Sequence, residues 1–389
     1  MTTLSPTGVA DDADDAAALE SVIDTIIGPQ AGEVDSTGAY PRAGLQALGR
    51  AGLLGLVSAT EAGGRGGDLA AAAHVVERLA GVCGSTAMVV LMHYAATAVI
   101  EAHGPKDVRE AIAAGEHVTT LAFSEVGSRS HFWAPLSTAT ADGGAAARLD
   151  ARKSWVTSAG EADSYVWSSR PLAAAGTMTL WLVPAGTAGL HVAGAFDGLG
   201  LRGNGSRPMT ADGARVPLSA VLGDDGAGLE SAMTTALPYF LVLSAAFSLG
   251  LMEALTVEAG AHLSRTRLAH LGQTLAEQPV QRAAYARLRI RTDQVRAFLG
   301  DTLAALGAGR QDEMLRVLEV KAVAAEGAAE VADGAMRLCG GSAFRKELGV
   351  ERRFRDALAA RVMAPTTDAL HDFIGRVSCG LPLFDGEGT

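Results

Sequence analysis

The spacing of apolar residues changes twice along the chain and so predicts three regions. From about Asp15 to His117, apolar residues recur three and four positions apart, which is the period of amphipathic helices. From His117 to Val221, short runs rich in β-branched and aromatic residues, such as 178–183, alternate with clusters of Gly, Pro, Asp and Ser. From Gly228 onward the helical period returns. We therefore expect helices, then a β-domain, then helices again.

The last region predicts a bundle of long helices. Three of them are expected over 237–267, 280–306 and 312–338, and a fourth from about 350 that is interrupted at Pro365. Their Ala-rich faces allow helices to approach closely, as in bundles. The expected fold is therefore of the α+β class and mostly α. It has an N-terminal α-helical domain at 1–117, a middle β-barrel or sandwich domain at 118–225 and a C-terminal four-helix bundle at 226–389.

Composition narrows the class of protein. Among 389 residues, 48% are hydrophobic, which is enough for sizeable cores, and 43 acidic against 32 basic residues give a net charge of −11. That charge argues against a nucleic-acid partner, because phosphate backbones are bound mainly through Lys and Arg. The three cysteines are widely spaced and fit neither a disulfide framework nor a zinc site, and the histidines do not cluster at metal-ligand spacing. We expect a cytoplasmic protein without a metal site.

No membrane span is expected either. The N-terminal 18 residues carry four aspartates where a signal peptide needs positive charge and an apolar run. The most apolar stretch, 237–255, contains Pro238, two serines and Glu253, so it falls short of the ~18 uninterrupted apolar residues of a transmembrane helix. A buried core helix explains this stretch better.

Several short motifs follow one another in a fixed order. Two lie in the β region, Leu121-Ala-Phe-Ser-Glu-Val-Gly-Ser-Arg-Ser130 and Arg152-Lys-Ser-Trp-Val-Thr-Ser-Ala-Gly-Glu-Ala-Asp163. They are followed by Gly198-Leu-Gly-Leu-Arg-Gly-Asn-Gly-Ser206, Leu338-Cys-Gly-Gly-Ser-Ala-Phe344 and Arg353-Phe-Arg-Asp-Ala357. In order and spacing, these motifs resemble those of the acyl-CoA dehydrogenase flavoprotein superfamily. The resemblance extends from about Leu19 to Phe384.

The resemblance implies a bound flavin, FAD rather than FMN. In the family, the first motif binds the pyrimidine edge of the flavin, and the second places a Trp against the isoalloxazine and a Thr hydroxyl on flavin N5. A flavin needs such a flat apolar wall and a few well-placed donors. The flavin-binding residues that the resemblance implies in this part of the chain are Phe123, Ser124, Ser130, Trp155 and Thr157.

The same resemblance implies that the other end of the dinucleotide is bound by a neighbouring subunit. Backbone N–H groups of a Gly-Gly turn can hold a phosphate group. The residues assigned to this end are Arg265, Arg267, Arg337, Gly340, Gly341, Thr366 and Asp368, with the register of the two arginines at 265 and 267 left open. A homotetramer or homodimer is therefore expected.

The sequence departs from the family pattern where the catalytic base should stand. Typical members carry a Glu after the Arg-Asp-Ala motif that removes the substrate's α-proton, and here Ala364 occupies that position. The alternative position, on the first long helix of the bundle, falls in 237–242, which has no carboxylate. The catalytic residue is thus left open, with the acid–base candidates Asp368, Glu125, His93 and His131.

Substrate contacts are expected from a second group of residues. The candidates are His93, Ser128, Tyr239 and Phe240, with Ser130 as the alternative to Ser128. A single His on an apolar helix is more often a core residue than a catalytic one, and core packing also explains Tyr239 well.

Three functions fit this sequence. The first is an acyl-CoA or acyl-carrier-protein dehydrogenase-like oxidoreductase with a non-standard base. The second is a flavin-dependent monooxygenase or N-hydroxylase, because 275–281 looks more like that branch of the superfamily and a dry pocket matters more there than an α-proton base. The third is a non-catalytic member. The expected partners are a small molecule or acyl thioester and an electron-transfer protein or flavin reductase.

Overall fold

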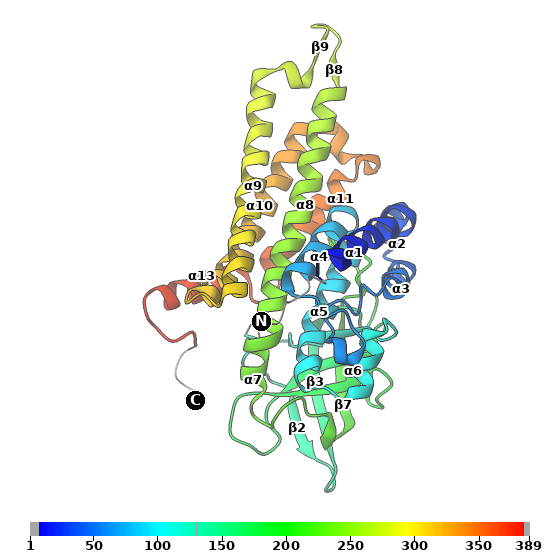
Figure 1. Ribbon diagram of the computed structural model, residues 1–389, viewed down its shortest axis with the longest axis vertical. Helices are drawn as coiled ribbons and strands as arrows, with labels where there is room; N and C mark the ends of the chain where they lie inside the picture. Colours follow the sequence, from blue (N-terminus) through cyan, green and yellow to red (C-terminus); the bar gives the residue numbers. More distant parts are fainter. Residues whose placement is uncertain (1–7, 129–130, 385–389) are drawn as a thin grey trace, which may run out of the picture.

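The computed structural model describes residues 8–128 and 131–384 of the chain. Figure 1 shows a bundle of long helices at one end of the molecule and the β-domain at the other, with the N-terminal helices beside them. The fold is the mostly helical three-part architecture expected from the sequence: a helical domain, a β-domain and a second helical domain.

The N-terminal domain consists of helices packed around two apolar members, α4 and α5. Its α-helices are α1 (Gly8–Val22), α2 (Gly28–Thr37), α3 (Arg42–Arg50), α4 (Leu69–Val82), α5 (Gly84–His103) and α6 (Lys106–Ala113). Asp68 directly precedes α4, and its carboxylate accepts a hydrogen bond from the amide of Ala71 at 2.9 Å and so caps the helix. Nearly every residue of α5 is buried, because neighbouring elements cover it on all sides.

The β-domain is built from two small sheets that share a core. The first has the order β1 (Thr119–Ala122), β4 (Ser164–Ser169), β5 (Thr179–Pro184), with β1 and β4 parallel. The second is antiparallel, in the order β2 (Thr138–Ala141), β3 (Ala146–Val156), β7 (Arg207–Pro217), β6 (Leu190–Val192). Trp167 and Trp181 of the first sheet and Leu149 of the second are fully buried between them.

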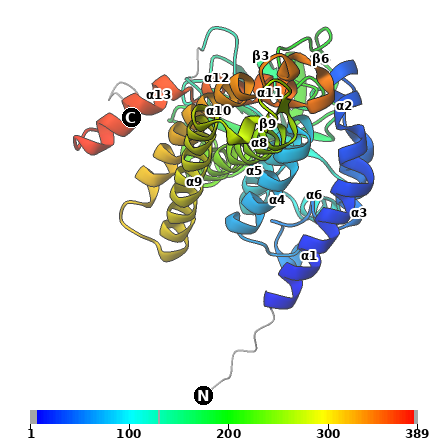
Figure 2. The same ribbon diagram turned by 90° about the horizontal axis from the view of Figure 1, so that it is seen from above.

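The C-terminal domain is dominated by three long helices. These are α8 (Leu237–Arg265), α9 (Pro279–Ala308) and α10 (Glu313–Cys339), and they lie side by side in both views (Figures 1 and 2). The short elements α7 (Gly228–Ser231) and η4 (Ala232–Ala236) lead into α8, and a small hairpin of β8 (Arg267–Leu268) and β9 (Gln273–Thr274) connects α8 to α9. Helix α8 also packs against α4, which joins the two helical domains.

The expected fourth helix of the bundle is divided into three. It consists of α11 (Val350–Ala357), α12 (Ala359–Val362) and α13 (Thr367–Ser378). The chain turns between α12 and α13 at Pro365, which has no N–H to donate to a helix. This division matters for function because the turn lies beside the main cavity.

Two helices are long and apolar enough, by length and composition alone, to cross a membrane: Gly84–His103 and Gly228–Arg265. In each helix, 83% of the most apolar 18-residue stretch is buried inside the protein. Both stretches therefore have the burial of core helices, as expected for 237–255 from its interrupting polar residues.

Candidate active site

A cavity of about 790 Å³ lies where the three domains meet. Helix α5 provides Met88 and Met92, and the segment after β1 provides Ser124 to Ser128. The end of β3, the loop before β7, the start of α8 and the segment 355–365 complete the lining. Such a size and a mostly apolar lining are typical of sites for small molecules and cofactors.

Three of the side chains expected to contact a flavin present polar or aromatic groups to this one cavity. Ser124, Trp155 and Thr157 all line it, although the first comes from the loop after β1 and the others from the end of β3. Neither the Ser124 nor the Thr157 hydroxyl has a hydrogen-bond partner among the residues described, and the Trp155 side chain is 63% exposed. An apolar ring beside two hydroxyls with free hydrogen-bonding capacity fits an isoalloxazine.

The loop that carries Ser124 is fixed by a buried ion pair. Glu125 accepts a hydrogen bond from the Lys153 ammonium at 2.6 Å, and both side chains are almost fully buried. Lys153 also donates to the carbonyl of Ser168, and the amides of Leu136 and Ser137 donate to Glu125. Each charge is thereby compensated, so the pair anchors the loop to β3.

The pKa values of this pair follow from its surroundings. Burial opposes the ionisation of Glu125, but the Lys153 ammonium and the hydrogen bonds outweigh it and lower the pKa of the carboxyl group. Burial lowers the pKa of Lys153 to about 8, against the attraction of Glu125. Glu125 is therefore an ionised carboxylate whose oxygens are already occupied, and its placement argues against a role as a catalytic base.

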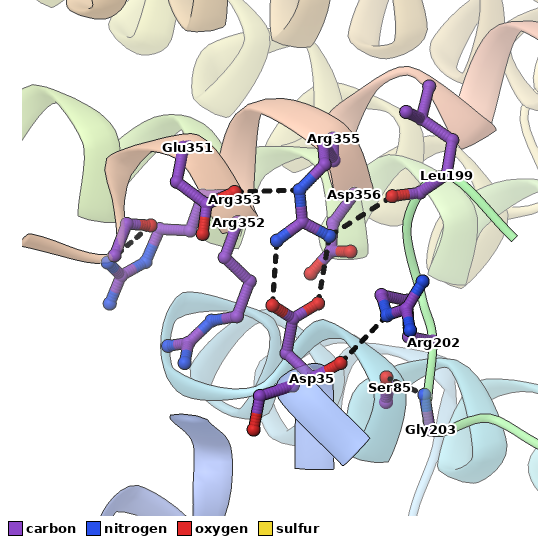
Figure 3. Close-up of polar contacts among 12 residues, drawn as sticks. Asp35, Ser85, Leu199, Arg202, Gly203, Glu351, Arg352, Arg353, Arg355 and Asp356 are labelled. Atoms are coloured by element: carbon purple, nitrogen blue, oxygen red, sulfur yellow. Dashed lines mark hydrogen bonds and ion pairs between the residues drawn. The ribbon is translucent and has the colours of Figure 1, made fainter. Parts of the chain in front are cut away.

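Another part of the cavity wall is held by a network around Arg355, shown in Figure 3. The Arg355 guanidinium forms two hydrogen bonds with the Asp35 carboxylate, at 2.9 and 2.7 Å, and a third with Glu351 at 2.7 Å. It also donates to the carbonyl of Leu199 at 3.0 Å. These bonds tie α2, α11 and the cavity loop together, and they raise the pKa of Arg355 above its ordinary value.

The next residue, Asp356, also binds the loop that contains Leu199. Its carboxylate is buried and accepts a hydrogen bond from the amide of Leu201 at 2.6 Å. Leu201 has a φ of 53°, a left-handed backbone conformation that residues other than glycine rarely adopt. The Asp356 bond and a hydrogen bond from the Gly203 amide to the Ser85 hydroxyl, at 3.0 Å, hold this loop in place.

Comparisons with known proteins identify the family. Models of the N-terminal, middle and C-terminal domains of acyl-CoA dehydrogenases match residues 15–115, 120–214 and 226–378. The chain belongs to the acyl-CoA dehydrogenase family. Members of this family are flavin oxidoreductases that act on the CH–CH bonds of acyl-CoA, and they typically bind FAD.

Individual relatives of this acyl-CoA dehydrogenase family member are distant. The human mitochondrial short-chain specific acyl-CoA dehydrogenase is 27% identical over 348 residues, which cover 87% of this chain and 83% of the human protein. Butyryl-CoA dehydrogenase from Megasphaera elsdenii has the same fold, with a TM-score of 0.89, 20% identity and coverage of 97% and 100%. FkbI, described as serving biosynthesis of the methoxymalonyl extender unit of Fk520, gives a TM-score of 0.82 at 25% identity, with 95% and 100% covered.

Ala364 lines the cavity, at the position where the resemblance to the family leads one to expect the catalytic Glu. Leu237 and Phe240, from the stretch of α8 that holds the base in some members, line it too and are apolar. Only two charged side chains occur in the lining as described, Glu125 and Arg355, and both are ion-paired. The described lining therefore offers no unpaired carboxylate to remove a proton.

His93 is separate from the cavity. It is fully buried in α5, where its Nε2 lies 3.0 Å from the carbonyl of Leu54 and its Nδ1 accepts a hydrogen bond from the amide of Thr119 at 3.2 Å. Burial lowers the pKa of His93 to about 4, so the ring is neutral near pH 7. With both nitrogens occupied by backbone groups, His93 has the placement of a core residue, which argues against an acid–base or substrate role.

The other acid–base candidates also lie outside the lining. His131 is exposed, with Nδ1 2.8 Å from the carbonyl of Ser128 and its ring 4.7 Å from that of Trp133. Asp368 is exposed in the first turn of α13. Tyr239 is half-buried against the core and does not line the cavity, whereas Ser128 and Phe240 do.

Among the residues expected to bind the flavin, Phe123 lines the cavity, and Ser130 lies outside the described part of the chain. Those expected to bind the other end of the dinucleotide do not line the cavity of their own chain; they are Arg265, Arg267, Arg337, Gly340, Gly341, Thr366 and Asp368. A Cβ added at Gly340 or Gly341 would meet nothing within 4 Å, so the turn is open to solvent. Their assignment to a neighbouring subunit's cofactor stays a prediction.

Sequence reasoning missed several residues that form the site. Met88, Met92 and Phe132 line the cavity, yet in the sequence they are ordinary apolar residues. An all-round apolar helix such as α5 gives no period from which its cavity-facing side can be read. The bonds of Arg355 and Asp356 were also missed, although their Arg-Asp-Ala motif was a signal that this segment is special.

Proposed function

We propose that this protein is an FAD-dependent oxidoreductase that acts on an acyl thioester, carried by CoA or by an acyl-carrier protein, and that it lacks a base at the family's usual position. The observation that carries the proposal is the meeting of Ser124, Trp155 and Thr157 in one cavity with Ala364. The first three fit a flavin, and the fourth provides no carboxylate.

The roles of the cavity residues follow from their chemistry. When bound, FAD supplies the hydride acceptor of the reaction. The hydroxyls of Ser124 and Thr157 hydrogen-bond the polar edge of the ring system, and Trp155 provides its apolar wall. Phe132 and Phe240 are both nearly buried at the cavity surface and exclude water from the acyl group.

A second candidate function is a flavin-dependent monooxygenase or N-hydroxylase. The carboxylate-free lining favours it, because oxygen transfer from a flavin depends on a dry, enclosed site more than on a base for an α-proton. Retained flavin-binding side chains argue against a non-catalytic member, since a scaffold without chemistry has no need of Trp155 and Thr157.

We further propose that the functional form is a homotetramer or homodimer. The residues assigned to the far end of the dinucleotide, such as Gly340 and Thr366, do not line the cavity that holds Trp155, and this supports completion of the site by a second subunit. Light scattering of the FAD-loaded protein tests this assignment. A monomer with full FAD affinity would refute it.

Stopped-flow absorbance of the FAD-loaded protein tests the reaction. One arm mixes it anaerobically with a panel of acyl-CoA and acyl-carrier-protein thioesters, and the other mixes the reduced protein with oxygenated buffer. Bleaching of the flavin by a thioester would establish the dehydrogenase. No bleaching, with a transient absorbance band after oxygen is added, would establish the monooxygenase and direct the search to a reductase partner. A protein that binds no flavin would refute both.

A pair of variants tests the missing base directly. Ala364→Glu puts a carboxylate at the cavity surface, and we expect thioester-dependent bleaching to rise at least about tenfold. Ala364→Gln is the matched control, because it has nearly the same size and no charge. Equal rates for the two variants would show that residue 364 is not where an α-proton is taken.

A further inference from the structure

Helix α10 contains a lysine that is buried without an acidic partner. Lys321 is 1% exposed, and no carboxylate forms an ion pair with it among the residues the structure describes. The other buried lysine, Lys153, is paired with Glu125. Lysines are rarely buried unless they are paired, because removing an ammonium from water is costly. The position of Lys321 therefore requires a compensating interaction.

Backbone carbonyls supply that compensation. The Lys321 ammonium donates to the carbonyls of Ala360, Met363 and Pro365, at 3.1, 2.9 and 2.7 Å. Its three N–H donors match these three acceptors, so its hydrogen-bonding capacity is fully used. Burial lowers the pKa of Lys321 to about 7.

The segment that carries the three carbonyls has no backbone N–H groups of its own to donate to them. Helix α12 is only one turn long, and the last carbonyls of any helix lack intrahelical donors. Pro365, three residues after the end of α12, has no N–H group to offer. Without Lys321, these carbonyls would be buried with no partner, or the turn between α12 and α13 would rearrange to reach water.

This same segment forms one wall of the main cavity. Val362, Met363, Ala364 and Pro365 all line it. Lys321 itself does not line the cavity, so it approaches the wall from behind. We propose that Lys321 is a positioning residue of this site, which fixes the 359–366 turn and thereby determines where residue 364 meets the bound ligand.

An apolar residue of similar length would fill the same volume at lower cost if packing were the only requirement. The use of an ammonium is explained by the three carbonyls it orders, two of which belong to cavity-lining residues, Met363 and Pro365. The proposal relies on the proposed function only for the identity of the ligand, FAD. The placement of the turn can be tested without it.

The test compares Lys321→Met with a control on the same helix. Lys321→Met keeps the side-chain volume and removes the charge and all three hydrogen bonds. Val331→Ala, at a buried position ten residues further along α10, destabilises the helix without removing those bonds. Lys321→Gln is the second variant, to be used if Lys321→Met does not fold, because it keeps an N–H donor without the charge.

Two readouts are measured for each variant, in the full chain. The first is hydrogen exchange of the amides in 359–366, where the Met363 amide is protected by a bond to the carbonyl of Ala359 at 3.0 Å. We expect exchange there to be at least tenfold faster in Lys321→Met and no faster in Val331→Ala. The second is the affinity for FAD, measured by quenching of tryptophan fluorescence, which we expect to weaken at least tenfold in Lys321→Met alone.

Each outcome decides a different point. Unchanged exchange in 359–366, or the same change in both variants, would overturn the positioning role. Faster exchange with unchanged FAD affinity would overturn the link between this turn and the site. If the unmodified protein binds no FAD, the proposed function fails, and the exchange comparison still decides whether Lys321 fixes the turn.

Discussion

The buried ion pair between Glu125 and Lys153 is expected to be one of the most sensitive points of the β-domain. Its side chains are 3% and 0% exposed, and the two charged atoms lie 2.6 Å apart. Removing either partner leaves the other charge buried without compensation. The perturbation is therefore a set of three variants: Glu125→Gln, Lys153→Met and the two together.

The magnitude follows from burial. Breaking a buried pair from one side costs about 3–5 kcal/mol, so each single variant should lower the free energy of unfolding by that amount. Two independent losses would sum to about 6–10 kcal/mol. The double variant leaves no uncompensated charge, and we expect it to cost at least about 2 kcal/mol less than that sum, which is a coupling typical of residues in contact.

Guanidinium unfolding followed by tryptophan fluorescence measures these differences. Trp167 is a local reporter, because the Lys153 ammonium lies 5.2 Å from its ring centre. The matched control is the exposed pair of Lys106 and Glu110, 3.2 Å apart, whose side chains are 80% and 48% exposed. Breaking that pair should cost less than about 0.5 kcal/mol. The reasoning is refuted if the buried pair costs no more than the exposed one, or if the two single losses add in the double variant.

Three further predictions concern other contacts of the fold. Arg355→Lys keeps the charge but cannot form the bidentate hydrogen bonds with Asp35, so the unfolding free energy should fall by about 1.5–3 kcal/mol. Stability close to that of the wild type would contradict a structural role for these two bonds. His93, with its pKa lowered to about 4 by burial, takes up a proton only when the chain unfolds at pH 4 to 6.5, so stability falls as the pH drops through that range. Between pH 7 and 5 the unfolding free energy should fall by roughly 2 kcal/mol, and His93→Gln should remove this loss. Plots of unfolding free energy against pH that run parallel for the two proteins would exclude this. Phe384→Ala removes a ring stacked 5.0 Å from Trp133, so tryptophan emission should shift to the red and the unfolding free energy should fall by about 1 kcal/mol. An unchanged emission spectrum would show that the C-terminal segment does not cover Trp133.

The elements of the fold were largely predictable because their patterns are local. Helical spacing predicted the long helices of the bundle within a few residues of α8, α9 and α10, and alternating short runs predicted the β region. The break in the fourth helix was only partly visible. Pro365 marked it, but the separate turns α11 and α12 depend on contacts with α10 that no local pattern contains.

The candidate site shows where such reasoning stops. Motif order singled out Ser124, Trp155 and Thr157, and counting after the Arg-Asp-Ala motif singled out Ala364. All four line the cavity, and their roles there stay predictions. His93 and Met92 are neighbours on one apolar helix, yet only Met92 lines the cavity, because the packing of α5 decides which face is covered. Glu125 was a candidate base by residue type, and only the folded chain shows its buried ion pair with Lys153, 28 residues away, which argues against that role.

The sequence by itself determined the order of helices and strands, the three-part architecture, the resemblance to a flavoprotein family and the absence of a Glu at position 364. These features rest on periodicity and spacing, which are properties of the chain alone. The tertiary structure decided which polar residues are free to react and which are occupied. That choice depends on burial and on partners distant in sequence, as for Lys321 and its three carbonyls, and only the folded chain brings them together.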